Sequence, residues 1–402
     1  MRLAGYKERS QERKTVLSSE FLPFHKPDIG EAEIRAVVET LHSGWLTTGA
    51  KVKAFEAEFA KYIGCSYAVA VNSGTAALHL ALDAIGVNEG DEVIVPAMTF
   101  AATAEVVFYL KAKPVLVDCQ ADTLNLDTER IEAAITPRTK AIIPVHLAGH
   151  PCDMNRILEI AKLHKLKVIE DAAHALPASY RDKKVGTIGD VTCFSFYATK
   201  TITTGEGGMA TTENPDWAKR IRMMSLHGIS LDAWDRYTDK GSWYYEITRP
   251  GYKYNLTDIA AALGIEQLKR CDDFYQARRR IAERYDEGFA DLPEIQLPAC
   301  ASDIQHAWHL YIIQLNIERL RISRQDFIKA LKSQNIGTSV HFIPLHLHPF
   351  YRDTFGYRPA DFPQATAVFE RIVSLPIYPK MTERDVDHVI DAIKKLVREY
   401  RR

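Results

Sequence analysis

Short apolar strands alternate with helical segments through the first two thirds of the chain, and this alternation restricts the fold more than any other feature. Runs rich in β-branched residues predict strands, and apolar residues recurring every three or four positions predict helices. The expected strands are residues 67–71, 92–95, 115–118, 141–145 and 168–171, and the expected helices are residues 52–62, 76–84, 101–110 and 154–163. Repeated units of this kind form a mainly parallel sheet with helices on both faces. We therefore predict an α/β fold.

Polar residues lie at or near the ends of these expected strands: Asn72, Asp118, His146 and Asp171. Ligands of mainly parallel sheets bind beyond the carboxyl ends of the strands. We expect side chains from separate segments to meet there.

The pattern changes after residue 256. We expect one long amphipathic helix over residues 256–289, followed by a strand at 310–315, a helix at 324–332, a sheet edge at 338–342 and a final helix at 383–397. These elements predict a smaller α+β domain. Residues 21–265 would form the large domain and residues 266–402 the small one, with residues 1–20 as an extension whose composition predicts flexibility.

Composition is that of a globular enzyme. The formal net charge of the 402 residues is −1, which gives no electrostatic sign of nucleic-acid binding. No apolar run reaches the roughly 20 residues of a membrane span, and the charged start has no apolar signal-peptide core. The six cysteines include no C-x-x-C pair, which argues against disulfides and thiolate zinc sites. We expect a cytoplasmic protein without membrane or nucleic-acid partners.

Two charged residues suggest the chemistry. Asp171 ends an apolar strand, and Lys200 follows Phe194-Ser195-Phe196 and precedes Gly205-Glu206-Gly207-Gly208. A buried acid can pair with a protonated pyridine nitrogen, and a lysine in a dry pocket can form an imine with an aldehyde. Each residue alone is more often structural, as a turn residue or a solvated cation. Together they indicate pyridoxal phosphate chemistry.

A candidate phosphate site lies where residues 68–71 run into Ser73-Gly74-Thr75 and the helix that follows. A small-residue turn that opens a helix presents free N–H groups and the positive end of the helix dipole to an anion. A simple helix cap is the alternative interpretation of this turn. Neither G-x-G-x-x-G nor G-x-x-x-x-G-K-[ST] occurs here, which argues against a dinucleotide dehydrogenase or a P-loop enzyme.

These motifs, together with Glu170-Asp171-Ala172-Ala173-His174, resemble those of the sugar-nucleotide aminotransferases, the DegT/DnrJ/EryC1/StrS branch of the fold-type I pyridoxal phosphate enzymes. The resemblance extends from about residue 21 to residue 397. It implies an aspartate aminotransferase-like large domain with a mainly parallel seven-stranded sheet. Within the family, segments such as Ser43-Gly44-Trp45, residues 250–258 and residues 306–310 most resemble the aminotransferase that forms UDP-4-amino-4-deoxy-L-arabinose.

The resemblance also implies roles for individual residues. Lys200 would bind the cofactor aldehyde covalently and then act as the acid and base, while Asp171 would pair with the ring nitrogen. The expected cofactor-binding residues are Gly74, Thr75, Phe100, Asp171, Ala172, His174, Ser195, Lys200 and Asn255. Among them Phe100 would stack on the ring, where the arabinose enzyme has tryptophan, Ala172 would pack on the opposite face and His174 would lie near the phenolic oxygen. Family members supply the asparagine matching Asn255 from a second subunit, which implies a homodimer with shared sites.

Candidate substrate-binding residues follow from the same resemblance: Trp45, Thr48, Tyr197, Lys253 and His341. Close spacing of His341, His346 and His348 permits an alternative interpretation as a metal site, but no carboxylate accompanies them, and we expect no metal.

The implied reaction transfers nitrogen from L-glutamate to a 4-keto nucleotide sugar, because Glu206 in the glycine motif is typical of members that aminate 4-keto sugars. A UDP-linked substrate is preferred. A 3-keto sugar, or a GDP- or dTDP-linked 4-keto-6-deoxyhexose, remains an alternative, since Tyr197 and Thr199 differ from the arabinose enzyme. A sugar dehydratase would carry histidine in place of Lys200, and a non-catalytic scaffold would have no use for these motifs.

Overall fold

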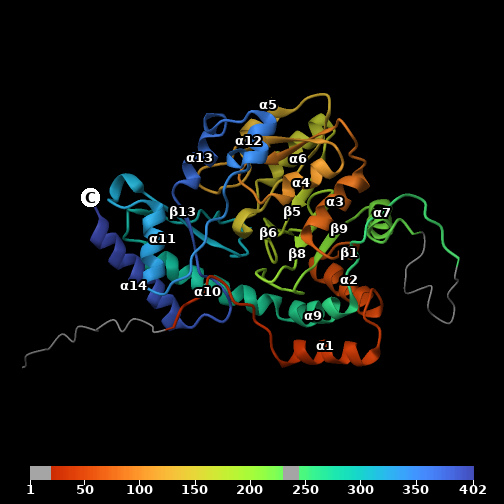
Figure 1. Cartoon of the computed structure of the whole chain (residues 1–402), viewed down its shortest axis with the longest axis horizontal. Coiled ribbons are helices and arrows are strands. Elements are labelled where there is room, and N and C mark those ends of the chain that lie inside the picture. The colour runs from red at the N-terminus through yellow and green to blue at the C-terminus, as the bar shows by residue number, and fades with distance from the viewer. Residues whose placement is uncertain (1–19, 230–243) are drawn as a thin grey trace, which may run out of the picture.

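The computed structural model describes residues 20–229 and 244–402 (Figure 1). The extension predicted over residues 1–20 therefore lies, except for residue 20, outside the described part of the chain. Its helices are α1 (Glu31–Ser43), α2 (Ala50–Ile63), α3 (Gly74–Ile85), α4 (Ala102–Tyr109), α5 (Ile131–Ala134), α6 (Met154–His164), α7 (Pro215–Ser225), α9 (Asp258–Lys269), α10 (Cys271–Phe289), α11 (Arg324–Ser333), α12 (Pro349–Phe355), α13 (Pro363–Phe369) and α14 (Glu383–Tyr400). None of these described helices is both long and apolar enough to cross a membrane.

The strands form three sheets. Their bounds are β1 (Tyr67–Val71), β2 (Glu92–Pro96), β3 (Lys113–Val117), β4 (Thr139–Ile142), β5 (Lys167–Asp171), β6 (Ser179–Tyr180), β7 (Lys183–Lys184), β8 (Val191–Ser195), β9 (Gly208–Thr212), β10 (Ile295–Gln296), β11 (Ile304–Gln305), β12 (Tyr311–Leu315) and β13 (Ile372–Leu375). The large sheet has seven strands in the order β1-β9-β8-β5-β4-β2-β3, and β9 alone runs antiparallel to the other six. This confirms the predicted mainly parallel sheet.

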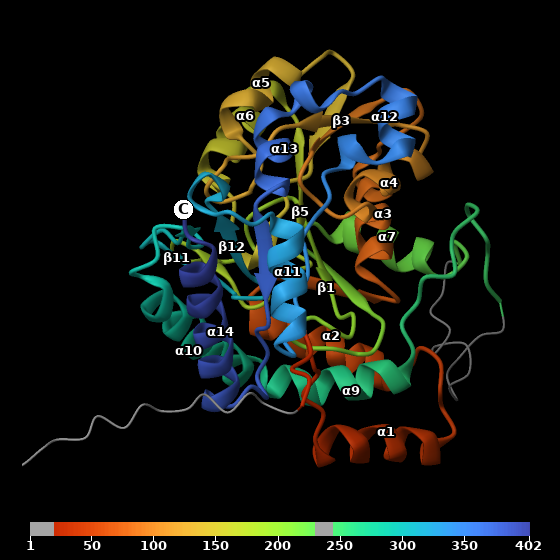
Figure 2. The same cartoon turned by 60° about the vertical axis from the view of Figure 1, so that its left-hand side comes forward.

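Both faces of the large sheet are buried, because alternate side chains of one strand enter different cores. Val69 and Val71 of β1 pack with α3, α4 and α7, whereas Ala68 and Ala70 pack with α2 and α9. At the other end of the sheet, α6 covers the second face. Figures 1 and 2 show these helices on the two sides of the strands. The nearly continuous apolar strands of the sequence are explained by this double coverage.

Helix ends agree with local sequence signals. The Ser73 hydroxyl accepts a hydrogen bond from the N–H of Ala76 and thereby starts α3. Gly64 ends α2 in the left-handed conformation with φ of 89°, as its position after the apolar stripe predicts.

The single helix predicted over residues 256–289 is wrong, because two helices, α9 and α10, meet at Arg270. At Arg270 the backbone leaves the helical conformation, and the guanidinium pairs with Asp28 and Glu33 at 3.1 and 2.8 Å. No proline or glycine marks this break. Tertiary ion pairs with the N-terminal segment lie where the break occurs.

The predicted sheet edge at residues 338–342 is also not a strand. Within it, Ser339 forms an isolated bridge to Ser374 of β13, and the rest of the segment is irregular.

A second core lies around the sheet β10-β12-β13, between α10, α11 and α14. Residues 349–369, which include α12 and α13, instead return to the large sheet, where Tyr351, Ala365 and Val368 join its core. The expected boundary after residue 265 falls inside α9. We propose that the two domains divide near α9 and α10.

Candidate active site

A cavity of about 480 Å³ lies beyond the carboxyl ends of β5 and β8, where the predicted site residues gather. Nine of the predicted residues line it: Gly74, Thr75, Phe100, Asp171, His174, Ser195, Tyr197, Lys200 and His341. His341 follows α11, whereas the others lie on the large sheet, on α3 or on the connecting loops. Residues far apart in sequence thus meet at the predicted end of the sheet.

Asp171 is the last residue of β5, and its carboxylate is buried at the base of the cavity. Its oxygens accept hydrogen bonds from the Thr103 hydroxyl at 2.8 Å and the Ala173 N–H at 3.1 Å. Burial raises the pKa of Asp171, although these bonds and nearby Lys200 oppose the rise. Within the described chain no cation forms an ion pair with it. The site therefore holds an acid that a bound cationic group would stabilise.

Lys200 lies on the loop after β8, and its amine projects into the same cavity. Burial lowers the pKa of Lys200 to about 8, and the Asp171 carboxylate partly opposes this fall. Among the described residues, the amine has no hydrogen-bond or ion-pair partner. A lysine in this state is uncharged more often than an ordinary lysine, and an uncharged amine is the nucleophilic form.

The Ser73-Gly74-Thr75 turn opens α3 at the cavity wall, close to Ser195 at the end of β8. A Cβ atom on Gly74 would lie 2.9 Å from the Ser195 Cβ, so glycine permits the close approach of turn and strand. The first N–H groups of a helix have no partner inside the helix. The turn and the Ser195 hydroxyl can therefore bind an anion from two sides.

Four imidazoles surround the amine of Lys200: His25, His174, His309 and His341. The rings of His174 and His309 lie 4.5 Å apart, and His341 contacts the Ser374 hydroxyl at 2.9 Å. Burial is the main cause that lowers all four pKa values, to about 3 for His25 and about 4 for His341. At neutral pH these rings are uncharged, so that Lys200 and the carboxylates Asp171 and Glu206 supply the ionisable charge of the cavity.

Aromatic rings form the mouth of the cavity. Phe100 is 62% exposed, and its ring lies 5.8 Å from that of Phe342. Ala172 is buried in the core, and the neighbouring Ala173 lines the cavity in its place. An exposed Phe100 ring beside a deep polar pocket is available for stacking with a flat ligand.

Four of the predicted residues do not line this cavity but form a cluster of their own. The Lys253 ammonium donates to the Asn255 side chain at 2.7 Å, Asn255 donates to the Thr48 hydroxyl at 2.7 Å, and the Trp45 indole donates to the Thr48 carbonyl at 3.1 Å. Asn255 lines a second, open hollow that shares only Glu206 with the cavity. In a single chain, these residues are apart from Lys200.

Sequence reasoning missed Thr103, which donates to Asp171, as well as His25 and His309 in the cavity wall. Thr103 lies one helical turn after Phe100, so a helix beginning near residue 101 could have indicated that both face one site. His25 and His309 carried no comparable signal, because only the fold brings the N-terminal segment and β12 to the cavity.

The histidines considered as metal ligands point to different places. His341 faces the cavity, whereas His346 contacts the Thr366 hydroxyl at 2.9 Å and packs against Phe362. In the described ranges, no group of three histidine, cysteine or acidic side chains is placed to hold a metal ion.

Comparison with known proteins gives a consistent result over nearly the whole chain. The model of the DegT/DnrJ/EryC1/StrS aminotransferase family matches residues 27–394. An uncharacterized protein of Methanocaldococcus jannaschii is 57% identical over 386 residues, which cover 96% of this chain and all of that protein. The spore coat polysaccharide biosynthesis protein SpsC of Bacillus subtilis is 52% identical over 379 residues, which cover 94% of this chain and 97% of SpsC.

Among solved structures, a protein of Streptococcus pneumoniae assigned as a sugar aminotransferase, Spr1654, superposes with a TM-score of 0.89 in its PMP form. The two chains are 40% identical, and the match covers 94% of this chain and 99% of Spr1654. The PLP form of the same protein gives a TM-score of 0.88.

Proposed function

The chain belongs to the DegT/DnrJ/EryC1/StrS aminotransferase family, and on that premise we propose that it transfers an amino group from L-glutamate to a 4-keto nucleotide sugar. It is a sugar aminotransferase with pyridoxal phosphate as cofactor. The observation that carries the proposal is the meeting of Asp171 and Lys200 in one cavity, from β5 and from the loop after β8.

The residues present fit the cofactor. Bound pyridoxal phosphate supplies an aldehyde that forms imines with amines and a protonated ring that withdraws electrons from the carbon bearing the nitrogen. The buried Asp171 carboxylate has no ion pair within the described chain and can hold the ring N–H⁺. The turn at Gly74 and Thr75, with the Ser195 hydroxyl, can bind the phosphate. Phe100 and His174 border the space between these two ends.

Lys200 would serve first as the anchor and then as the proton carrier. Its Nζ can bind the cofactor aldehyde, and once an amino donor replaces it there, the free amine is available as a base. With a pKa of about 8, Nζ can take a proton from the substrate carbon and release it again near neutral pH. The four uncharged histidines around it leave Nζ as the group best placed for this transfer.

The choice of sugar rests on the residues at the mouth of the cavity. Glu206 and Tyr197 both line it. Because the glycine motif with Glu206 resembles that of members that act on 4-keto sugars, it supports amination at C4 rather than C3. We infer a UDP-linked 4-keto sugar, with the UDP-4-amino-4-deoxy-L-arabinose-forming reaction and its place in lipopolysaccharide modification as the nearest comparison. Thr199 also lines the cavity, so the two residues that differ from the arabinose enzyme, Tyr197 and Thr199, both border the space proposed for the substrate. They favour a 4-keto-6-deoxyhexose on UDP, GDP or dTDP as the second candidate.

A homodimer would complete the site. We propose that the Asn255 cluster, with Trp45, Thr48 and Lys253, faces the cavity of a second subunit. There it would contact the phosphate of the cofactor and the sugar of the substrate. Apolar side chains on α1 support an interface on this side of the molecule: Ile34, Val38 and Leu41 are 42–51% exposed on one helix that packs on α9. Three large apolar residues on one exposed helical face are typical of a surface that a partner covers.

Absorbance tests the cofactor and the reaction together. Purified protein should be yellow, should lose that colour when glutamate is added, and should be fixed at Lys200 by borohydride. A colourless preparation that binds no pyridoxal phosphate would contradict the proposal.

A panel of substrates tests the sugar. We expect 2-oxoglutarate to form from glutamate only with 4-keto sugars, and faster with the UDP-linked sugar than with GDP- or dTDP-linked ones. Equal turnover of all three nucleotides would show that the preference for UDP is wrong, and turnover of a 3-keto sugar alone would overturn the assignment to C4.

A further inference from the structure

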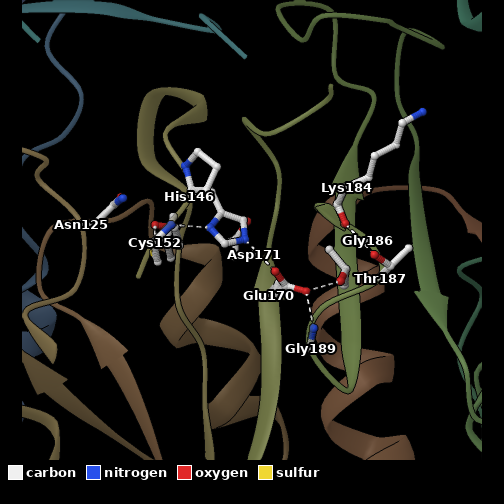
Figure 3. Close-up of polar contacts among 12 residues, drawn as sticks. Asn125, His146, Cys152, Glu170, Asp171, Lys184, Gly186, Thr187 and Gly189 are labelled. Atoms are coloured by element: carbon white, nitrogen blue, oxygen red, sulfur yellow. Dashed lines mark hydrogen bonds and ion pairs between the residues drawn. The ribbon is translucent and has the colours of Figure 1, made fainter. Parts of the chain in front are cut away.

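A fully buried histidine–carboxylate pair lies directly behind Asp171 (Figure 3). The Nε2 of His146 is 2.9 Å from Oε2 of Glu170, and neither side chain has any exposed surface. The other oxygen of Glu170 accepts from the Gly189 N–H at 2.7 Å and from the Thr192 hydroxyl at 2.6 Å. Both Glu170 oxygens are therefore hydrogen-bonded, and two other segments of the chain, at His146 and at residues 189–192, meet on this carboxylate.

The direction of these hydrogen bonds is fixed by their donors. The backbone N–H of Cys152 points at Nδ1 of His146 over 3.1 Å, so Nδ1 accepts and carries no proton. The proton of the neutral ring must then lie on Nε2, where it is donated to Glu170. Burial lowers the pKa of His146 and its hydrogen bonds raise it, with a net rise, but a second proton could be added only by displacing the Cys152 N–H from Nδ1.

The pair is joined to Asp171 through the backbone. The His146 N–H donates to the Asp171 carbonyl at 3.1 Å, and the Asp171 N–H donates to the Pro144 carbonyl at 2.9 Å. Side chains alternate along a strand, so Glu170 is directed to the opposite face of β5 from Asp171. His146 thus holds this dipeptide twice, by its main chain at Asp171 and by its ring at Glu170.

We propose that Glu170 and His146 are positioning residues that hold the Asp171 carboxylate in place against the cofactor ring. This inference rests on the proposed function, since Asp171 has this task only if pyridoxal phosphate binds in the cavity. A purely structural role would stabilise the fold without changing the cofactor. A positioning role changes the electronic state of the bound ring.

Glu170→Gln is the sharpest test because it keeps the shape of the side chain and changes one hydrogen-bond donor. The Gly189 N–H can only donate, so the amide oxygen of the glutamine must face it, and the amide N–H groups then face the N–H of His146. If the His146 proton moves to Nδ1, it meets the Cys152 N–H. Either way one buried hydrogen bond is lost, and the end of β5 shifts.

We expect this variant to raise the pH midpoint of the bound cofactor's absorbance by roughly half a pH unit. A displaced Asp171 would hold the proton on the ring nitrogen less firmly. A ring without that proton repels a positive charge on the nitrogen of Lys200 less strongly, so this nitrogen would keep its proton to a higher pH. We also expect kcat to fall about tenfold with KM for the sugar nearly unchanged, because a misplaced Asp171 reduces stabilisation of the transition state more than it reduces substrate binding. Absorbance is recorded against pH in the holoenzyme, and kcat and KM by 2-oxoglutarate release.

Glu92→Gln is the matched control. Glu92 is likewise buried and hydrogen-bonded, to Thr136 and Arg138, but it starts β2 at the opposite end of the sheet. The Glu92→Gln variant should have a lower melting temperature than the wild-type protein but the same absorbance midpoint. Thr192→Val removes one donor from Glu170 and should produce a smaller shift in the same direction, which keeps the inference testable if Glu170→Gln does not fold.

An unchanged midpoint in Glu170→Gln, or in Thr192→Val where that variant has to be used, would overturn the inference, as would an equal shift in Glu92→Gln. Failure of the wild-type protein to bind the cofactor would instead contradict the proposed function, so the two failures are distinguishable.

Discussion

Asp171 and Lys200 determine the charge at the base of the cavity, and each perturbs the pKa of the other. Burial raises the pKa of the acid and lowers that of the amine to about 8, and the attraction between the two groups partly opposes both shifts. At neutral pH the Lys200 amine is therefore uncharged more often than that of an ordinary lysine, and only the uncharged amine can act as a nucleophile or a base.

Covalent capture of pyridoxal phosphate by Lys200 should depend on pH with a midpoint near the pKa of about 8. With that pKa about one tenth of the amine is uncharged at pH 7, against ~0.03% for a lysine with the ordinary pKa of 10.5. The rate, followed by absorbance in cofactor-free protein, should rise roughly tenfold from pH 7 and level off above pH 8. A rate that still climbs tenfold between pH 9 and pH 10 would contradict this pKa.

Asp171→Asn tests the effect of the carboxylate on the pKa of Lys200. The carboxylate raises the pKa of Lys200, so its removal should move the capture midpoint below pH 8 while folding is retained. A midpoint that moves upward would show that Asp171 does not act on Lys200 through its charge.

At the scale of elements, the glycine motif acts through β9. A Cβ atom on Gly208, the first residue of β9, would lie 2.4 Å from the Ser73 carbonyl oxygen and 2.7 Å from the Gly74 nitrogen. The motif is therefore needed to let β9 pass beneath the turn that opens α3. This steric reason does not depend on the identity of the substrate.

Gly208→Ala should displace that turn and weaken binding of pyridoxal phosphate by about tenfold or more, since a backbone contact cannot move aside as a flexible side chain can. Fluorescence titration of the cofactor measures the change. Gly90→Ala is the control, because Gly90 has a left-handed φ of 85° and lies in open space before β2. That variant should lose about 1 kcal/mol of unfolding free energy with cofactor affinity unchanged. Normal affinity in Gly208→Ala would contradict a cofactor role for the turn.

At the scale of the whole molecule, the predicted residues fall into two groups that one chain does not unite. Lys200 and its neighbours line the cavity, while Asn255 and its partners form a separate cluster outside it. An active site shared between two subunits would bring the groups together, and the exposed apolar face of α1 is suited to such an interface.

Mixing two inactive variants tests this arrangement. Lys200→Ala and Asn255→Ala should each lose most activity, and after joint unfolding and refolding about one quarter of wild-type activity should return, since half the dimers are mixed and each has one complete site. Light scattering checks that both variants are dimers. Absence of recovery in mixed dimers would show that Asn255 serves the cavity of its own chain.

From the sequence we could predict the mainly parallel sheet, the acid at the end of β5, the turn that opens α3 and the family, because these features depend on local periodicity and on motifs that stay within a few residues. Contacts between residues far apart in the sequence could be found only in the tertiary structure, because periodicity reports only on neighbouring residues. The helix break at Arg270 coincides with ion pairs to residues about 240 positions earlier, Thr103 reaches Asp171 across the sheet, and His25 and His309 meet Lys200 from distant segments. The pKa of Lys200 belongs to this second class as well, since burial arises only when the surrounding segments are packed together.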